Sequence, residues 1–199
     1  MQFDFRDKEL SLPNARISYY PNFLMRKDAN HMFDTLLKHT SWRQDQIKVF
    51  GKVYNQPRLT ALYSTTARTY SYSGLTMHPE PFPDYLLRLK LQIENTSHHS
   101  FNSLLLNLYR NGSDSNGWHA DNEKELGINP VIASVSLGEQ RPFHFKHRQL
   151  KEHRYKLELG HGSLLLMSGE MQHYWLHQIA KTKRHIGPRI NLTFRTLIV

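Results

Sequence analysis

The sequence predicts a mainly β protein, an antiparallel sandwich or jelly roll with two helices packed on its outside. Three observations lead to this fold class. Short strand-like segments follow one another through the second half of the chain with no helical segment between them. Two amphipathic helical segments precede them. The length of 199 residues suits a single domain.

Two segments carry apolar residues at helical spacing. In residues 26–40, Met32 and Leu36 fall on one face of a helix, and residues 83–95 repeat this spacing. Pro83 is typical of a helix start. Both segments are therefore expected to be amphipathic helices that pack on the sheet.

Between the two helices, residues 42–79 are rich in Thr, Tyr and Ser, with turn residues at 55–57 and 73–74. This composition predicts short strands and exposed loops. Turn-rich segments at 111–117 and 160–162 then separate the later strands. Those strands are expected at residues 101–109, 131–137, 142–147, 155–159, 163–167, 173–179 and 189–199.

The chain is basic, with 26 Lys and Arg against 17 Asp and Glu, a formal charge of +9. The excess gathers in residues 141–156 and after residue 171. Clustered positive charge favours a polyanionic partner, nucleic acid first. A solvated basic surface is the plainer interpretation.

The absence of cysteine excludes disulfides, thiolate nucleophiles and cysteine-ligated metal sites. Any metal site must use His, Asp or Glu, and 13 histidines are available. No apolar run approaches the roughly 20 residues that cross a bilayer, and the first ten residues do not resemble a secretory signal. We expect a protein that is not secreted, located in the cytoplasm of a bacterial host or the nucleus of a eukaryotic one.

The last expected strand alternates strictly between polar and apolar residues. Because strand side chains alternate between faces, its apolar residues must meet the core, and its polar residues line either a cavity or solvent. On a cavity wall, two arginines would form a clamp for a carboxylate. The polar face carries Arg189, Asn191, Thr193 and Arg195, and the apolar face carries Ile190, Leu192 and Phe194.

His119 and Asp121 form a His-x-Asp pair. If this segment is extended, both side chains point the same way and can bind one metal ion. A distant histidine would complete a face of two histidines and one carboxylate. His173 and His177 share a strand face, so alternation does not choose between them. A surface turn is the alternative interpretation of the pair.

Asn107 and Tyr109 share a face of the strand before this pair, with Leu104, Leu106 and Leu108 on the other face. A buried asparagine needs hydrogen-bond partners, which favours a polar cavity on that side. Packing of Tyr109 in the core is the alternative.

The chain resembles the AlkB family of Fe(II)- and 2-oxoglutarate-dependent dioxygenases in the order of four motifs, namely Asn-x-Tyr, His-x-Asp, a distant His and Arg-x-Asn-x-Thr-Phe-Arg. The resemblance runs from about residue 50 to 195. It implies one catalytic domain over residues 1–199 with a double-stranded β-helix (jelly-roll) core at about 95–199. N-terminal helices would form an extension over residues 1–45, and a nucleotide-recognition lid would span about 46–80. The sharpest matches are residues 107–111, 119–123, 132–136, 160–165 and 189–195.

The resemblance implies that His119, Asp121 and His177 are the catalytic iron ligands. His177 is preferred because the family's third ligand follows a Trp-x pair, as it does here. Six strand residues span roughly 20 Å, longer than the cosubstrate. The two arginines must therefore both reach inward, or one of them has another role. Arg189 is the stronger candidate for binding a carboxylate of 2-oxoglutarate. The residues implied for 2-oxoglutarate are Asn107, Tyr109, Arg189, Asn191 and Arg195.

The implied reaction is oxidative demethylation with Fe(II), 2-oxoglutarate and O2, releasing succinate, CO2 and formaldehyde. Family substrates are 1-methyladenine and 3-methylcytosine, which are cationic. Glu123, two residues beyond Asp121, would favour a cationic base electrostatically. A solvated Glu123 is the alternative, and many relatives have an acid where this chain has Asn122.

Tyr63 and Tyr72 match family positions that contact a flipped base, with core tyrosines as the alternative. Phe50, within Val49-Phe50-Gly51, resembles the apolar finger of relatives that act on duplex DNA. Residues 57–61 and 102–105 instead resemble the relative that prefers single strands and RNA.

We favour duplex DNA with single strands tolerated, bound by a monomer without a membrane partner. The basic stretch 141–154, with Lys181, Lys183 and Arg184, would hold the phosphates. The alternatives are the same chemistry on RNA or on a protein, and a non-catalytic nucleic-acid-binding jelly roll.

Overall fold

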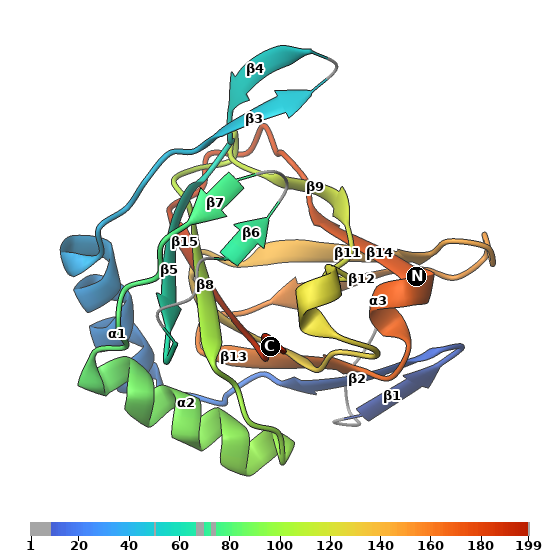
Figure 1. Cartoon of the computed structure of the whole chain (residues 1–199), viewed down its shortest axis with the longest axis horizontal. Coiled ribbons are helices and arrows are strands. Elements are labelled where there is room, and N and C mark those ends of the chain that lie inside the picture. The colour runs from blue at the N-terminus through green and yellow to red at the C-terminus, as the bar shows by residue number, and fades with distance from the viewer. Residues whose placement is uncertain (1–8, 50, 67–69, 73–74, 199) are drawn as a thin grey trace.

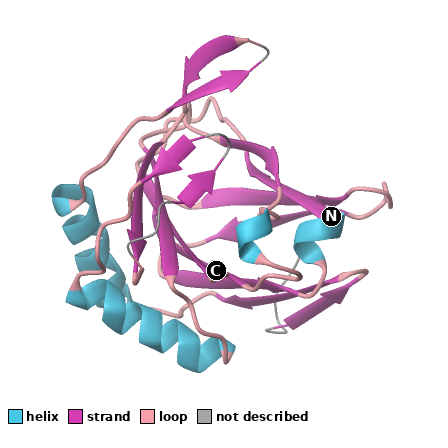
Figure 2. Cartoon of the chain, in the orientation of Figure 1, coloured by secondary structure: helices cyan, strands magenta, loops and turns pink. Residues whose placement is uncertain are grey.

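Two antiparallel sheets face each other, and two long helices cover the outer face of the larger sheet (Figure 1; Figure 2). The computed structural model describes residues 9–49, 51–66, 70–72 and 75–198. The predicted antiparallel sandwich or jelly roll is confirmed. The site described below lies between the two sheets.

In the described residues, the larger sheet has the order β1-β2-β13-β10-β15-β8-β5. Its strands are β1 (Glu9–Leu12), β2 (Ala15–Tyr20), β5 (Leu59–Ser64), β8 (Ser103–Tyr109), β10 (Ile132–Gly138), β13 (Ser163–Ser168) and β15 (Arg189–Arg195). The smaller sheet has the order β12-β11-β14-β9. Its strands are β9 (Asn116–His119), β11 (Arg141–His147), β12 (Arg154–Leu159) and β14 (Trp175–Ile179).

The apolar faces of β15 and β8 meet the helices, as the alternation predicts. Antiparallel pairing places Leu192 opposite Leu106 and Phe194 opposite Leu104. These side chains are 0% exposed, in one core cluster with Leu36 of a helix. The polar residues of both strands are thereby directed to the opposite face, toward the smaller sheet.

The two predicted helices are confirmed, as α1 (Arg26–His39) and α2 (Asp84–Ser97). Leu36 of α1 and Leu86 and Ile93 of α2 are fully buried. Pro83 occupies the N-cap of α2. None of the described helices is long and apolar enough to span a membrane.

The expected N-terminal helical extension over residues 1–45 contains the helix α1 and also two strands that were not predicted. β1 and β2 extend the larger sheet, with β2 paired to β13. The physical reason is a two-residue period: Ala15, Ile17 and Tyr19 are buried, whereas Arg16, between the first two, is exposed. This alternation covers only six residues, too few to stand out beside the longer helical pattern that follows.

Two hairpins occupy the segment between the helices, where short strands were predicted. One is β3 (Gln46–Val49) and β4 (Lys52–Asn55), which projects from the body at the top of Figure 1. The other is β6 (Tyr70–Tyr72) and β7 (Leu75–Met77). Phe50 falls between β3 and β4 and lies outside the described residues. The side chain of Tyr72 is likewise outside the described part of the chain.

Gly138 ends β10 at a position where no side chain fits. Its φ is +84°, and an added Cβ would meet the carbonyl oxygen of Pro188 and the ring of Phe33. We expect Gly138→Ala to lower the free energy of unfolding by about 2 kcal/mol or more, through left-handed backbone strain and steric overlap. Urea denaturation checks this.

Gly51 is the matched control, because its φ is +79° but no atom lies within 4 Å of an added Cβ. Gly51→Ala should show the backbone strain of about 1–2 kcal/mol without the overlap. Equal losses in the two variants would contradict the packing argument at Gly138.

Candidate metal centre and cosubstrate cavity

Three potential metal ligands converge at the edge of the smaller sheet. β9 and β14 pair antiparallel and place His119 opposite His177, with ring centroids 4.2 Å apart. Asp121 follows two residues after His119. One ligand atom from each of the three side chains lies within 4.8 Å of the others, and no second such cluster occurs among the described residues. The predicted His-x-Asp…His set is therefore assembled in space.

His173, the other candidate for the third ligand, is elsewhere. The chain forms the short helix α3 (Met171–Tyr174) before β14 begins, so His173 is not on the strand as expected. Its Nε2 accepts a hydrogen bond from the backbone N–H of Asn129 at 3.4 Å. The structure places His177, not His173, with the other two ligands.

The tautomer of His119 leaves one ring nitrogen available to a metal. Nδ1 lies 2.7 Å from the carbonyl oxygen of Gly117, which can only accept, so Nδ1 carries the proton. Nε2 is then unprotonated and accepts a hydrogen bond from Asn116 Nδ2 at 3.1 Å. Coordination by Nε2 requires this state.

Burial and local charge set the protonation that a divalent metal needs. Burial lowers the pKa of His119, and it lowers that of His177 to about 3, with His119 adding to the effect. Burial alone would raise the pKa of Asp121, but Arg195 and the two histidines bring it to about 2. Two neutral imidazoles and one carboxylate are the state that binds a divalent ion.

Asp121 is held by two groups that also orient it. Arg195 Nη2 donates to Asp121 Oδ1 at 2.9 Å, and the pair is almost fully buried. The backbone N–H of Asp121 donates to Gln172 Oε1 at 2.9 Å. Arg195 thus has a carboxylate partner within the protein, which favours the alternative that one of the two arginines has another role. No sequence pattern pointed to Gln172.

One cavity between the sheets joins the metal ligands to the polar face of β15. It encloses about 510 Å³ when its open mouth is included. The polar faces of β15 and β8 therefore line a cavity, and the solvent-exposed alternative is wrong. The residues predicted for 2-oxoglutarate all line this cavity, namely Asn107, Tyr109, Arg189, Asn191 and Arg195. Their individual roles stay predictions.

Arg189 is a buried cation that lacks a carboxylate partner among the described residues. Its Nη2 donates to Ser136 Oγ at 2.9 Å, whereas Nε and Nη1 have no hydrogen-bond partner there. Its guanidinium lies 5.3 Å from the centroid of the Tyr109 ring. Burial lowers its pKa to about 10, so it is still charged at neutral pH. Such a cation favours an anionic ligand, and a carboxylate of 2-oxoglutarate fits it.

Asn191 is bonded within the protein. Its Nδ2 donates to Ser134 Oγ at 2.7 Å and to the carbonyl oxygen of Val135 at 3.2 Å. Its Oδ1 accepts from Thr193 Oγ1 at 2.9 Å. These bonds fix the cavity wall between the two arginines.

Arg58 is a cavity residue that sequence reasoning missed. It is 5% exposed, and its Nε donates to Asn107 Oδ1 at 2.8 Å. Its Nη1 also donates to the carbonyl oxygen of Ser115 at 3.4 Å. The available signal in the sequence is its place in residues 57–61, which resemble the relative that prefers single-stranded nucleic acid. Arg58 orients the amide of Asn107 at the wall of the cavity.

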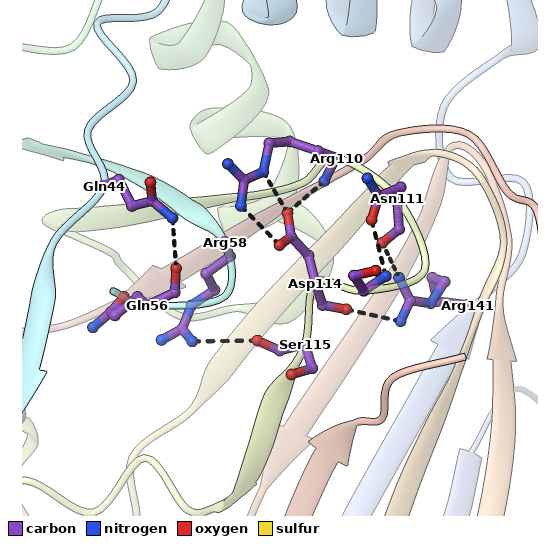
Figure 3. A network of polar contacts seen from close by, with 9 residues as sticks. Gln44, Gln56, Arg58, Arg110, Asn111, Asp114, Ser115 and Arg141 are labelled. Atoms are coloured by element: carbon purple, nitrogen blue, oxygen red, sulfur yellow. Dashed lines mark hydrogen bonds and ion pairs between the residues drawn. The ribbon is translucent and has the colours of Figure 1, made fainter. Parts of the chain in front are cut away.

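The loop from β8 to β9, which leads to His119, is fastened by two arginines (Figure 3). Arg110 donates to the Asp114 carboxylate through its backbone N, Nε and Nη2 at 2.8–2.9 Å. Arg141 donates from Nη1 to the carbonyl of Asn111, and from Nη2 to those of Asp114 and Ala180. Arg141 is only 1% exposed, so its expected role in holding phosphates is wrong. Its guanidinium holds the loop instead.

Two further predicted residues lie away from the cavity. Tyr63 pairs with Leu104 on the helix-facing side of the sheet, 6.2 Å from Phe82 between ring centroids, and is 5% exposed. This placement favours a core tyrosine. Glu123 lies at the N-cap of the turn η1 (Lys124–Leu126) and is not among the described residues that line the cavity.

Comparison with known proteins matches the chain to a family profile and to named relatives. A family profile described as the 2OG-Fe(II) oxygenase superfamily matches residues 16–195. The alpha-ketoglutarate-dependent dioxygenase alkB homolog 3 of Bos taurus is 43% identical over 92% of this chain. The DNA oxidative demethylase ALKBH2 of Homo sapiens is 34% identical over 87% of this chain.

The chain spans 66% of the bovine relative and 70% of the human one. The solved structure of OsALKBH1 covers 94% of this chain with a TM-score of 0.66 at 16% identity, and the match covers all of that chain. That likeness supports the jelly-roll fold.

The family description names iron and 2-oxoglutarate, and the residues present fit both. Two neutral histidines and one carboxylate are typical of a non-haem Fe(II) site with open positions. Arg189 supplies a buried cation in the same cavity. Family membership thus implies Fe(II), with 2-oxoglutarate and O2 as cosubstrates. The chain belongs to the 2OG-Fe(II) oxygenase superfamily and, within it, to the AlkB family.

Proposed function

We propose that this chain is a dioxygenase that oxidatively demethylates N-alkylated bases, 1-methyladenine and 3-methylcytosine, in DNA. One observation carries the chemistry: His119, Asp121 and His177 share one cavity with Arg189, which has no carboxylate partner in the described residues. The names of the relatives, a dioxygenase and a DNA oxidative demethylase, support the reaction and the substrate class.

His119, Asp121 and His177 would hold Fe(II), and Arg189 would bind a carboxylate of 2-oxoglutarate with Tyr109 and Asn107 beside it. When bound, iron and 2-oxoglutarate supply the oxidation by O2 of an N-methyl group to N-hydroxymethyl, with 2-oxoglutarate converted to succinate and CO2. The N-hydroxymethyl group then loses formaldehyde, which leaves N–H on the repaired base.

The protein's own residues prepare the site for this reaction. Arg195 keeps the carboxylate of Asp121 ionised and oriented, and the carbonyl oxygen of Gly117 accepts from Nδ1 of His119, which leaves Nε2 for the metal in exchange for its contact with Asn116. The Phe143 ring packs on His177 with centroids 5.2 Å apart. These contacts hold the ligands in place before any ion binds, and they limit water around His177.

The test is a turnover assay on a duplex oligonucleotide that carries one 1-methyladenine. We expect mass spectrometry to show loss of one methylene only when Fe(II), 2-oxoglutarate and O2 are all present. Succinate without repair would move the substrate to RNA or protein. If neither product forms, the non-catalytic nucleic-acid-binding jelly roll becomes the better account.

The β3–β4 hairpin should set the preference for duplex DNA. In the sequence, Phe50 falls between the two strands of this hairpin, and an apolar wedge can fill the gap that a flipped base leaves in a duplex. We expect Phe50→Ala to lower kcat/KM on duplex DNA by about 10-fold or more, and to change the value on the same single strand little. Competing-substrate assays measure this ratio.

Tyr54→Ala is the matched control, since Tyr54 is an exposed aromatic residue on the same hairpin. It should leave the ratio unchanged. An unchanged ratio in Phe50→Ala would remove the finger from the proposal. We also propose that the protein acts as a monomer where its host keeps DNA, the cytoplasm in bacteria or the nucleus in eukaryotes.

A further inference from the structure

The outer face of the smaller sheet carries an exposed tryptophan among basic side chains. Trp118 is 41% exposed, and it neighbours His119, which lines the cavity on the other face of the sheet. We propose that this outer face binds an unpaired segment of the DNA strand, with Trp118 as the platform on which a base stacks. The inference rests on the proposed function and extends it from the target base to the strand around it.

The register of the sheet places basic residues together on this face. Lys146 of β11 pairs with Arg154 of β12 and with Leu176 of β14. Two residues away, His144 pairs with Lys156. The intervening Phe145 is buried toward the core, so alternation directs these paired basic side chains outward.

Trp118 is held in place by one of these cations. Lys146 Nζ lies 4.2 Å from the centroid of the Trp118 ring, a cation–π contact. A single exposed aromatic residue is ordinary on a protein surface. An aromatic residue fixed in a groove of positive charge is the combination that binds unpaired nucleic acid, because bases stack on the ring while cations follow the phosphates.

Two adjoining grooves make a continuous path along this face, which we call the outer trough. The first is lined by Trp118, Lys146 and Arg154, and the second by Lys181 and Arg184, and both include His144 and Lys156. Apart from the buried Arg141, five Lys and Arg side chains line the trough. They face two carboxylates, Glu139 and Glu158, of which Glu158 pairs with Lys156. The charge therefore complements a polyanion.

The topology connects the outer trough to the metal centre. β9 is the last strand of the smaller sheet, so no further described strand covers its edge. A DNA strand can pass over this edge, with one base on Trp118 and the target base in the cavity beside His119. The base on Trp118 must be unpaired, because a paired base is already stacked on its neighbours. We therefore assign the trough to single-stranded DNA.

The test measures binding of a lesion-free, fluorescein-labelled oligothymidylate of about 16 nucleotides to the full chain by anisotropy. Without an alkylated base, capture in the cavity contributes nothing. We expect Trp118→Ala to raise Kd by about 5- to 100-fold, the range for one lost base–aromatic stack. Trp118→Tyr should restore most of the affinity. Leu91→Ala, which removes an exposed apolar side chain on α2, should change nothing.

The dependence of Kd on salt concentration separates the contribution of base stacking from that of the phosphate contacts. Trp118→Ala should leave the slope of log Kd against log salt unchanged, whereas Arg154→Gln should lower its magnitude by about 0.7, as expected for one lost phosphate contact. A change of slope in Trp118→Ala, with Arg154→Gln silent, would overturn the assignment of the two roles.

A second measurement does not depend on how Trp118→Ala folds. The sequence has three tryptophans, and Trp175 is fully buried, so Trp42→Phe leaves Trp118 as the exposed one. Bound strand should protect its fluorescence from acrylamide. Unchanged quenching, or wild-type Kd in a folded Trp118→Ala protein, overturns the inference even if repair is observed. Trp118-dependent binding without repair would leave it standing while the proposed reaction fails.

Discussion

An Arg189→Met variant will need at least about 30-fold more 2-oxoglutarate for half-maximal turnover. Loss of one partner from a buried, hydrogen-bonded charge pair costs about 2–5 kcal/mol of binding, which is roughly 30-fold to several thousand-fold in affinity. Arg189 is 1% exposed, and its Nε and Nη1 have no hydrogen-bond partner among the described residues, so these two donors are available to the cosubstrate. Steady-state kinetics against 2-oxoglutarate measures the change.

Stability supplies a second readout for Arg189. Removal of a buried charge that lacks a carboxylate partner should leave the free energy of unfolding unchanged or raise it, because an apolar side chain of similar size avoids the desolvation penalty. A fall of several kcal/mol in urea would show that Arg189 is chiefly structural. Arg189→Lys is the conservative control, and it should lie between wild type and Arg189→Met because it keeps the charge but loses the planar fork.

Asp121→Asn will abolish metal binding and reduce turnover to the rate measured without iron. The amide carries no charge to hold the ion, and it leaves Arg195 facing a neutral group in a site where the pair is 5% and 2% exposed. Breaking a buried ion pair costs about 3–5 kcal/mol. Calorimetric titration with Mn(II) and urea denaturation test the two effects separately.

The double variant Asp121→Asn with Arg195→Met distinguishes stability from function. It should recover most of the lost stability, because neither charge remains, yet still fail to bind metal. Arg195→Met alone should keep a site whose metal affinity is about 10- to 100-fold weaker, the usual effect of losing a group that orients a ligand. Wild-type metal affinity in Arg195→Met would contradict the positioning role of Arg195.

The parts of the fold that could be predicted from the sequence are those in which apolar residues recur at a regular spacing without interruption. β15 alternates strictly, so its core face was predicted correctly, but the alternation alone left its polar face open between a cavity and solvent. β5 does not alternate: its residues are nearly all buried, and the side on which Tyr63 lies could not be read from its neighbours. His173 was misplaced because α3, only four residues long, is too short to leave a periodic signal.

The residues that were missed work through contacts distant in sequence. Arg58 bonds Asn107, 49 residues away, and Gln172 bonds Asp121, 51 residues away. Arg141 lay within a basic stretch and was assigned with it, although its partners are carbonyl groups of two separate loops. No local sequence pattern distinguishes a buried arginine that donates to carbonyl groups from an exposed arginine that can bind a phosphate.

The pairing of β9 has a consequence for local opening of the smaller sheet. β9 is an edge strand with one sheet neighbour, and its register to β14 shifts between the pairs His177–His119 and Ile179–Asn116. An ion shared by His119 and His177 would cross-link these two strands through their side chains, at a place where their backbone pairing is irregular. Amide hydrogens of β9 should therefore exchange with solvent more slowly once the ion binds, while those of β15, paired on both sides, change little.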